Sequence, residues 1–381
     1  MLKYENSILV FTQKMDIATN TIRYHEMIEG SSRRRIAFEE HGNLFSSHIF
    51  LLLPGLLESR LSFKLLCQHL SGSFDCRIIT FDYCGRGASD ALKRAEDYKM
   101  STYLLDTEDL LRSYILKSHR NPAHTLYLVG SSMGGILAMH LIKKMEPRIH
   151  GLILNDIGLV LNWLSLFQLY KKINIPFAFK NNASIATSLN VHESVLERVK
   201  SPTHFDIEYE YDFMGMHFTS LLEAYTGSVS LIHHTQSVLC PLFVANKSKK
   251  IFPSLNLLSY PGANHPVAWT LDICKDVSRE LSLRVKPKNT PLLLSYDMQK
   301  SKNLSLQDIK KKSLGQGSVS GAFHPTPTKN LNTLKQFIDT SKNYLKTEIA
   351  SHPKPRDDQL SILCWLKGLF KKKPNKPEKG L

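Results

Sequence analysis

Closely spaced cysteines are missing from this chain. Its 381 residues contain six cysteines and no C-x-x-C pair; they are Cys67, Cys76, Cys84, Cys240, Cys274 and Cys364. Zinc sites and disulfide frameworks rest on clustered cysteines, so the spacing favours neither. We expect reduced thiols, as in a cytosol, and no metal or organic cofactor.

Long hydrophobic runs are missing as well. The first residues, MLKYENSILVFTQKMD, hold only the short apolar run ILVF, and no apolar run of about 18 residues occurs anywhere. A cleaved signal peptide and a membrane-spanning helix are therefore not expected. We expect a cytoplasmic protein, with peripheral attachment to a membrane as the alternative.

Acidic residues are scarce in the last hundred residues. From Arg284 to Leu381 the chain has 20 Lys and Arg against 7 Asp and Glu, so most of the net charge of +15 belongs to this tail. Residues 284–381 are rich in Lys, Ser, Gly and Pro, which predicts a largely disordered segment.

The tail ends in LSILCWLKGLFKKKPNKP, an apolar stretch with Trp and Phe next to a lysine run. Such a segment suits an anionic membrane surface, here through residues 359–376. A helix that docks on the protein or on a partner, and a solvated basic end, are the alternatives. No recognised nucleic-acid module is present, so no specific nucleic-acid binding is expected.

Apolar strand-like runs alternate with helix-like segments through much of the chain. After a hairpin-like start in residues 19–42, the strand-like runs are HIFLLLPG, CRIITFDY, TLYLVG and GLILNDIG. Continuous apolar strands that alternate with helices predict an α/β fold, in which a mostly parallel sheet is covered by helices on both faces.

The alternation stops at Leu159 and returns with CPLFVAN and LNLLSYPG, which we expect to be the last two strands, before a closing helix in WTLDICKDVSRELSLRV. An insertion at this point would lie over the carboxyl ends of the strands, where open α/β sheets bind ligands. We therefore predict a lid at residues 158–238 within a domain of residues 1–283. Trp163 and Phe167 are candidates for the wall of an apolar substrate pocket, with packing inside the lid as the alternative.

The stretch YLVGSSMGGILAM places a serine between glycines, after an apolar run and before a helix-like one. Gly130-Ser131-Ser132-Met133-Gly134 fits G-x-S-x-G, the strand-to-helix turn that presents a serine as nucleophile. The helix N-terminus would place the Met133 amide beside a developing oxyanion.

A serine nucleophile needs a general base, and a histidine after the last strand is the natural candidate. His265, in SYPGANHPVAW, occupies that place. The glycine turn before it and the helix after it would aim the ring at Ser132.

At these motifs the chain resembles the α/β-hydrolase family, over residues 20–283. LLLPGLL is similar to the oxyanion strand and loop of the family, with Pro54 where a histidine is usual, and FDYCGRGASD is similar to its D-x-x-G-x-G-x-S turn. GSSMGGILAM followed by GLILNDIG resembles the nucleophile turn and next strand of its esterase-like members. The resemblance implies an oxyanion hole made by the backbone amides of Leu56 and Met133.

The third member of a triad, a carboxylate, is missing from the position where most of the family carries it. No Asp or Glu occurs between Ala224 and Leu271, and LFVANKSKKIFP has Lys247, Lys249 and Lys250 where an Asp belongs. Asp156, at the end of GLILND, is the replacement that some dehalogenases of the family use. The alternative is that Asp156 only caps the loop that follows it.

The remaining aspartates near these motifs are expected to have no part in the chemistry. Asp82 and Asp90 flank the CGRGASD turn and are expected to be structural. Asp106 and Asp109 fall on one helix face and are expected to be solvated.

Taken together, the residues and the resemblance predict a serine hydrolase that acts on an ester or related acyl substrate. Ser132 is its nucleophile, His265 its base and Asp156 the group that orients His265. The alternative is a hydrolase-like binding protein whose triad has decayed, associated with a membrane surface.

Overall fold

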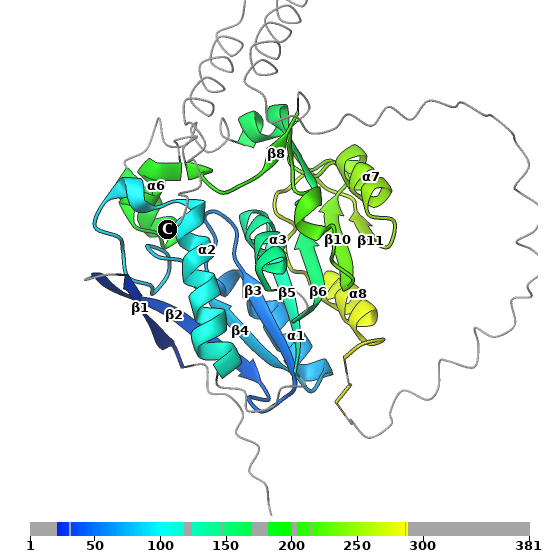
Figure 1. The fold of residues 1–381 in the computed structure, drawn as a ribbon, viewed down its shortest axis with the longest axis horizontal. Coiled ribbons are helices and arrows are strands. Elements are labelled where there is room, and N and C mark those ends of the chain that lie inside the picture. Colours follow the sequence, from blue (N-terminus) through cyan, green and yellow to red (C-terminus); the bar gives the residue numbers. More distant parts are fainter. Residues whose placement is uncertain are drawn as a thin grey trace, which may run out of the picture.

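Eight strands form one sheet, in the order β1-β2-β4-β3-β5-β6-β10-β11 (Figure 1). The computed structural model describes residues 21–29, 32–117, 124–145, 148–169, 182–199, 204–212, 215–285 and 287–288. The strands of the sheet are β1 (Arg23–Glu29), β2 (Ser32–Gly42), β3 (His48–Leu53), β4 (Arg77–Phe81), β5 (Thr125–Ser131), β6 (Ile149–Asn155), β10 (Ser228–His234) and β11 (Asn256–Tyr260). β1 pairs with β2, and β2 with β4, in antiparallel register, and the other pairs are parallel. The predicted fold class is therefore confirmed.

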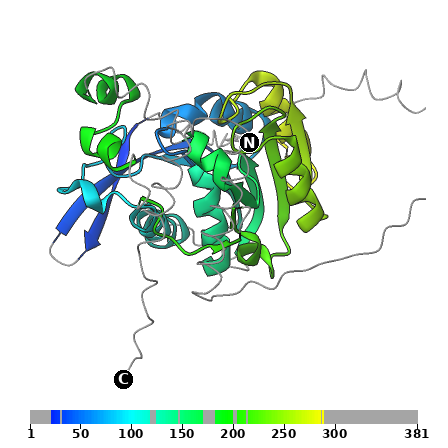
Figure 2. The same cartoon turned by 90° about the horizontal axis from the view of Figure 1, so that it is seen from above.

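Helices cover both faces of the sheet (Figures 1 and 2). They are α1 (Lys64–Ser73), α2 (Met100–Asp109), which continues as a π-helix (Leu110–Leu116), α3 (Met133–Met145), α7 (Leu242–Ile251) and α8 (Leu271–Leu281). One hydrophobic cluster joins the sheet to α1 and α8, and contains Phe50 and Ile273. The other joins it to α2, α3 and α7, and contains Leu104, Leu137 and Val244.

The central strands are apolar along their whole length because both of their faces are buried. Every residue of β4 is buried, as are five of the six residues of β3. In parallel strands with helices on both sides, alternate side chains enter opposite clusters, and both clusters exclude water.

The chain between β6 and β10 forms a separate group of short elements. They are β7 (Val160–Asn162), a helical stretch at residues 163–169, α5 (Asn182–Leu189), α6 (Glu193–Val199), β8 (Glu210–Tyr211), β9 (Gly215–His217) and a 3-10 turn (Thr219–Leu222). β7, β9 and β8 form a small antiparallel sheet. Backbone hydrogen bonds join Asn190 to Gly87 (2.8 Å) and His192 to Gly85 (2.7 Å), so this group contacts the turn that follows β4.

Two details of the predicted organisation differ from the structure. Residues 228–234 fall within the predicted lid, but they form β10 of the central sheet; the serines and histidines of SVSLIHH conceal a buried strand. CPLFVAN is not a strand, because residues 242–251 form α7, with Pro241 as N-cap and Val244, Ala245 and Ser248 buried at helical spacing.

Asp106 is not solvated, contrary to the sequence-based expectation. Its side chain is fully buried and forms an ion pair with Arg34 from β2, which is itself buried. Asp109 is 41% exposed and contacts His25 Nε2 at 2.7 Å, so the expectation fits Asp109 better. A helix face that is polar in sequence can still pack against a strand that supplies the opposite charge.

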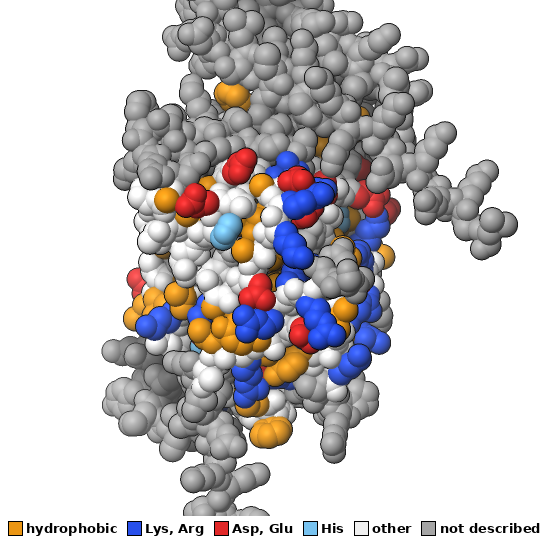
Figure 3. Space-filling model, turned by 90° about the vertical axis from the view of Figure 1, so that its left-hand side faces the viewer, with side chains coloured by type: hydrophobic (Ala, Val, Ile, Leu, Met, Phe, Trp, Pro, Cys, Tyr) orange, Lys and Arg blue, Asp and Glu red, His pale blue; other side chains and the backbone are white. Residues whose placement is uncertain are grey.

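The β1 edge of the molecule carries side chains of mixed chemistry (Figure 3). Tyr24 and Ile28 on β1 are exposed apolar residues, and this face of the molecule carries charged side chains of both signs (Figure 3). Arg35 pairs with Asp90 at 3.0 Å and stacks over the Tyr24 ring. Charged groups along an edge strand discourage pairing with another chain.

The C-terminal tail from residue 289, including the predicted membrane-binding segment at 359–376, lies outside the described residues. Within the described part of the chain, no helix combines the length and the apolar character needed to cross a membrane.

The buried Arg34–Asp106 pair generates a stability prediction. Asp106→Asn should lower the free energy of unfolding by about 3 kcal/mol, because it removes the negative charge from the buried ion pair with the Arg34 guanidinium. Urea denaturation followed by circular dichroism measures this change. Asp109→Asn is the control, and should cost less than about 1 kcal/mol because this carboxylate is partly solvated. Equal losses in the two variants would contradict the prediction.

Candidate active site

Ser132 lies in the tight turn between β5 and α3. Its backbone has a φ of +48°, a left-handed conformation that is uncommon for a residue with a side chain. The turn is held by the Ser132 amide, which donates to the Asn155 carbonyl at 2.9 Å. Gly134 allows the first turn of α3 to approach β3: a Cβ there would lie 2.1 Å from the Leu53 carbonyl oxygen. The turn thus has the strained geometry of a nucleophile elbow.

His265 lies in the loop that follows β11, and its ring reaches Ser132. The distance from Ser132 Oγ to His265 Nε2 is 2.7 Å. The Asn155 side chain holds this loop through the backbone of Val267: its Nδ2 donates to the Val267 carbonyl at 2.9 Å, and its Oδ1 accepts from the amide at 3.2 Å. His234 Nδ1 also lies 2.8 Å from the Asn264 carbonyl. The ring is therefore positioned through neighbours on β6 and β10.

Asp156 directly follows β6, and its carboxylate is fully buried beside His265. The distance from Asp156 Oδ2 to His265 Nδ1 is 2.8 Å. A backbone φ of +58° turns the residue away from the strand. Of the two predicted roles for Asp156, orientation of His265 and capping of the next loop, the geometry includes the contact that the first one requires.

The three side chains form one continuous chain of hydrogen bonds. Because the buried Asp156 carboxylate only accepts, His265 Nδ1 carries the ring proton toward it. His265 Nε2 is then an acceptor, and Ser132 donates its hydroxyl proton to it. In this arrangement the serine can lose a proton to Nε2 while the carboxylate stabilises the charged ring.

The carboxylate also has partners on the segment that follows β10. Ser237 Oγ donates to Asp156 Oδ2 at 2.7 Å, and the His234 amide donates to Oδ1 at 3.4 Å. Asp156 thus has three donors, which compensates for the burial of its charge.

The loop after β3 contains Leu56, whose amide is predicted to contribute to an oxyanion hole. The Gly55 amide donates to Glu58 Oε2 at 2.7 Å, and Arg86 Nε donates to the Leu56 carbonyl at 2.8 Å. Arg86 is fully buried, and its guanidinium lies 4.5 Å from the centre of the Tyr103 ring. Fixing the Leu56 carbonyl restricts the orientation of this loop. Met133, the other predicted amide donor, is the first residue of α3.

Two buried cysteines, Cys240 and Cys84, are poor nucleophiles. Burial, with a smaller contribution from the negative charge of Asp156, raises the pKa of the Cys240 thiol well above its usual range. Burial also raises the pKa of Cys84, on the turn after β4. A neutral thiol is a poor nucleophile, so these cysteines do not compete with Ser132.

Trp163 and Phe167 are buried in the cluster that contains α3 and the elements between β6 and β10. Trp163 Nε1 donates to the Asp212 carbonyl at 2.9 Å. These contacts are packing within the predicted lid. That Trp163 or Phe167 also lines a substrate pocket stays a prediction.

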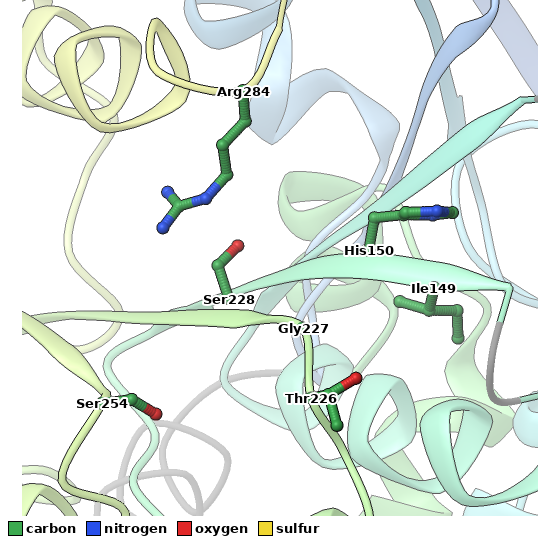
Figure 4. Close-up of a pocket in the computed structure, with 7 residues that line it drawn as sticks. All are labelled: Ile149, His150, Thr226, Gly227, Ser228, Ser254 and Arg284. Carbon is green, nitrogen blue, oxygen red and sulfur yellow. The ribbon is translucent and has the colours of Figure 1, made fainter.

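An open cavity of about 570 Å³ lies elsewhere, at the amino ends of β6 and β10 (Figure 4). It is lined by Ile149, His150, Thr226, Gly227, Ser228, Ser254 and Arg284. Ser132 and Asp156 lie at the carboxyl ends of β5 and β6. The cavity is therefore at the other end of the sheet and is not part of this site.

Four residues that position the site were not singled out by the sequence analysis: Asn155, His234, Ser237 and Arg86. Asn155 precedes Asp156. A pair of polar residues at the end of a buried strand could have indicated that Asn155 also has a role in the site. His234 and Ser237 lie in the segment that was assigned to the lid, so their proximity to Asp156 could not be inferred. Arg86 lies between the two glycines of the G-x-G turn, and its local sequence does not indicate its contact with the Leu56 carbonyl.

No group of three or more His, Cys, Asp and Glu side chains in the described ranges is arranged to hold a metal ion.

Comparison with known proteins adds the family context for this site. Residues 48–181, which contain β3, the nucleophile turn and β6, match the sequence profile of the alpha/beta hydrolase fold. The described part of the chain therefore has the alpha/beta hydrolase fold. A solved hydrolase from Rickettsia typhi superposes with a TM-score of 0.55 at 19% identity, covering 69% of this chain and 99% of that one. A haloalkane dehalogenase variant from Bradyrhizobium elkanii superposes with a TM-score of 0.51 at 15% identity, covering 68% and 97%.

Two curated proteins are similar to this chain over part of their length. The 3-hydroxybutyrate-oligomer hydrolase of Cupriavidus necator is 25% identical over 163 residues, which is 43% of this chain and 53% of that protein. Epoxide hydrolase 3 of Xenopus tropicalis is 33% identical over 117 residues, which is 31% of this chain and 26% of that protein. The aligned region thus spans about half of the first relative and about a quarter of the second.

The contact between α3 and β3 generates a prediction for the stability of the fold. Gly134→Ala should lower the melting temperature and displace the nucleophile turn, because its Cβ would overlap the Leu53 carbonyl. Gly72→Ala is the matched control in α1, since a Cβ there has no atom within 4 Å. Differential scanning calorimetry compares the two. A Gly134→Ala protein as stable as Gly72→Ala would contradict the proposed close approach.

Proposed function

We propose that the protein is a serine hydrolase that cleaves an ester or a related acyl bond through an acyl-enzyme on Ser132. The hydrogen-bonded chain from Ser132 through His265 to Asp156 is the observation that carries the proposal. The proposal is also supported by the two curated proteins with similar sequences. Both are hydrolases, although they act on different bonds.

In the first half of the reaction, Ser132 Oγ attacks the acyl carbon while its proton passes to His265 Nε2. The carbonyl oxygen becomes an oxyanion, which the amides of Leu56 and Met133 would stabilise. His265 then gives the proton to the leaving alcohol, and the acyl group stays on Ser132. In the second half, His265 takes a proton from water and the hydroxide attacks the acyl carbon. His265 then returns the proton to Ser132 Oγ as the bond to the acyl carbon breaks, and the acid is released.

Asp156 holds the imidazole with Nδ1–H toward the carboxylate and stabilises the imidazolium that each half-reaction creates. The position of Asp156 after β6 is compatible with this role, because its fully buried carboxylate lies 2.8 Å from His265 Nδ1. The absence of a carboxylate between Ala224 and Leu271 therefore does not require a decayed triad.

The identity of the nucleophile favours acyl chemistry over the opening of epoxides. A serine that attacks an acyl carbon forms an ester, which water can hydrolyse in a second step. A serine that opened an epoxide would form an ether, which an activated water does not cleave under the same conditions. Ser132 therefore favours an ester or related acyl bond in the proposed small-molecule substrate.

The group of elements between β6 and β10 is proposed as the lid over this site. It contacts the turn after β4 through Asn190 and His192, at the carboxyl ends of the strands. Its apolar cluster, which includes Trp163 and Phe167, would favour an apolar acyl or alcohol group. The basic segment at 359–376 is proposed to attach the protein to an anionic membrane surface. The protein is otherwise proposed to be cytoplasmic.

Covalent labelling tests the nucleophile. A fluorophosphonate probe should add its mass to the wild-type protein and not to Ser132→Ala, because only an activated serine displaces the fluoride. Ser131→Ala is the matched control: this neighbouring hydroxyl is buried without a hydrogen-bond partner, and its loss should leave labelling intact. Intact-mass spectrometry gives the answer. Labelling of Ser132→Ala, or none of the wild type, would refute the proposal.

A second experiment tests the acid. Asp156→Asn should lower kcat for a p-nitrophenyl ester by about 10⁴-fold, because the amide no longer favours the required tautomer of His265. Asparagine tolerates the left-handed backbone of this position, so the fold should survive. Asp272→Asn, whose carboxylate is 88% exposed on α8, serves as control and should keep full activity. Unchanged turnover in Asp156→Asn would show that Asp156 is a capping residue only.

A further inference from the structure

The Asp156 carboxylate shares one oxygen between two donors. Asp156 Oδ2 accepts from His265 Nδ1 at 2.8 Å and from Ser237 Oγ at 2.7 Å. Ser237 is 3% exposed and comes three residues after β10, which is the penultimate strand of the sheet in chain order, whereas LFVANKSKKI forms the helix α7. The usual position of the family's acid, after the penultimate strand, therefore falls in the segment of Ser237 and not at the lysines of α7, as the sequence had predicted. A hydroxyl thus occupies the region of the usual carboxylate and bonds to the carboxylate on the neighbouring strand.

The direction of the Ser237 hydroxyl is determined by its other contacts. The amides of Leu239 and Cys240 both donate to Ser237 Oγ, each at 3.2 Å. Because these donors occupy its lone pairs, the hydroxyl proton is directed to Asp156 Oδ2. Hydrogen bonds in such a chain strengthen one another, so Ser237 is a stronger donor than an isolated serine.

We propose that Ser237 is a positioning residue of the triad: it orients the Asp156 carboxylate and withdraws part of its negative charge from His265. This inference rests on the proposed function. Without Ser237, Oδ2 would face His265 alone, and the carboxylate could rotate about its last bond. The charged imidazole would be held more strongly, and the neutral imidazole that acts as base would form only at higher pH.

The other titratable groups of the segment that follows β10 have partners or charges that can be stated. Burial keeps Cys240 protonated, and its pKa is raised well above its usual range. His233 lies between the Cys240 carbonyl and Ser259 Oγ, at 3.0 and 2.8 Å. His234 contacts the Asn264 carbonyl. The helix α7, which begins after Pro241, carries Lys247, Lys249 and Lys250 in its second half.

The test is the pH dependence of p-nitrophenyl ester hydrolysis in Ser237→Ala, from pH 5 to 9. We expect kcat to fall about tenfold with KM nearly unchanged, since a hydrogen bond to a charged group is lost without a substrate contact. The acid limb of the kcat/KM profile should move upward by about half a pH unit. Ser237→Thr, which keeps the hydroxyl, should return both values toward wild type.

Ser248→Ala is the matched control. Ser248 is also a buried serine with bonds to the backbone, at 3.0 Å from both the Leu159 amide and the Val244 carbonyl, and it does not contact the triad. Its loss should lower stability without moving the pH profile. If Ser237→Ala does not fold, Ser237→Cys replaces it, because a thiol has nearly the same shape and is a weak donor.

The outcomes separate the inference from the function on which it rests. Wild-type protein without hydrolysis or Ser132 labelling would refute the proposed function itself. Wild-type activity together with an unchanged rate and pH profile in Ser237→Ala would overturn the role of Ser237 alone. A fall in kcat without a shift of the acid limb, reproduced by Ser248→Ala, would also overturn it, because it would reveal a merely structural effect.

Discussion

The hydrogen bond between Asp156 and His265 joins residues 109 positions apart in the chain. A buried carboxylate is stable only when donors surround it, and the donors of Asp156 come from the loop after β11 and from the end of β10. The carboxyl ends of β6, β10 and β11 must therefore converge on one point. The parallel register of these neighbouring strands provides that convergence.

Asn155 and Asp156, at the end of β6, hold different parts of the site. Asn155 fixes the backbone of the His265 loop through Val267, and its carbonyl accepts from the Ser132 amide. Asp156 contacts the imidazole ring itself. One strand end thus holds the nucleophile turn and the base in register, which is what a short hydrogen bond between Ser132 and His265 requires.

The loop after β3, which contains the proposed oxyanion donor Leu56, and the proposed lid are connected through the turn after β4. Arg86 holds the Leu56 carbonyl from within this turn, and the flanking Gly85 and Gly87 bond to the segment between α5 and α6. A movement of that segment would therefore be transmitted to the loop beside Ser132. Arg86 is fully buried, and its guanidinium lies over the Tyr103 ring, so this turn packs into the body of the fold.

Local sequence patterns were sufficient for the nucleophile turn, the histidine after the last strand and the layered α/β architecture, because continuous apolar strands, glycine turns and helix periodicity are properties of neighbouring residues. β10 and α7 were misassigned since SVSLIHH mixes polar with apolar residues and LFVANKSKKI begins like a strand. Asp106 looked solvated because Arg34, its partner, lies 72 residues away. The sequence by itself determined the α/β architecture and the candidates Ser132, His265 and Asp156; only the tertiary structure decided that Asp156 and Ser237 meet beside His265, because that depends on β6 and β10 being adjacent in the sheet.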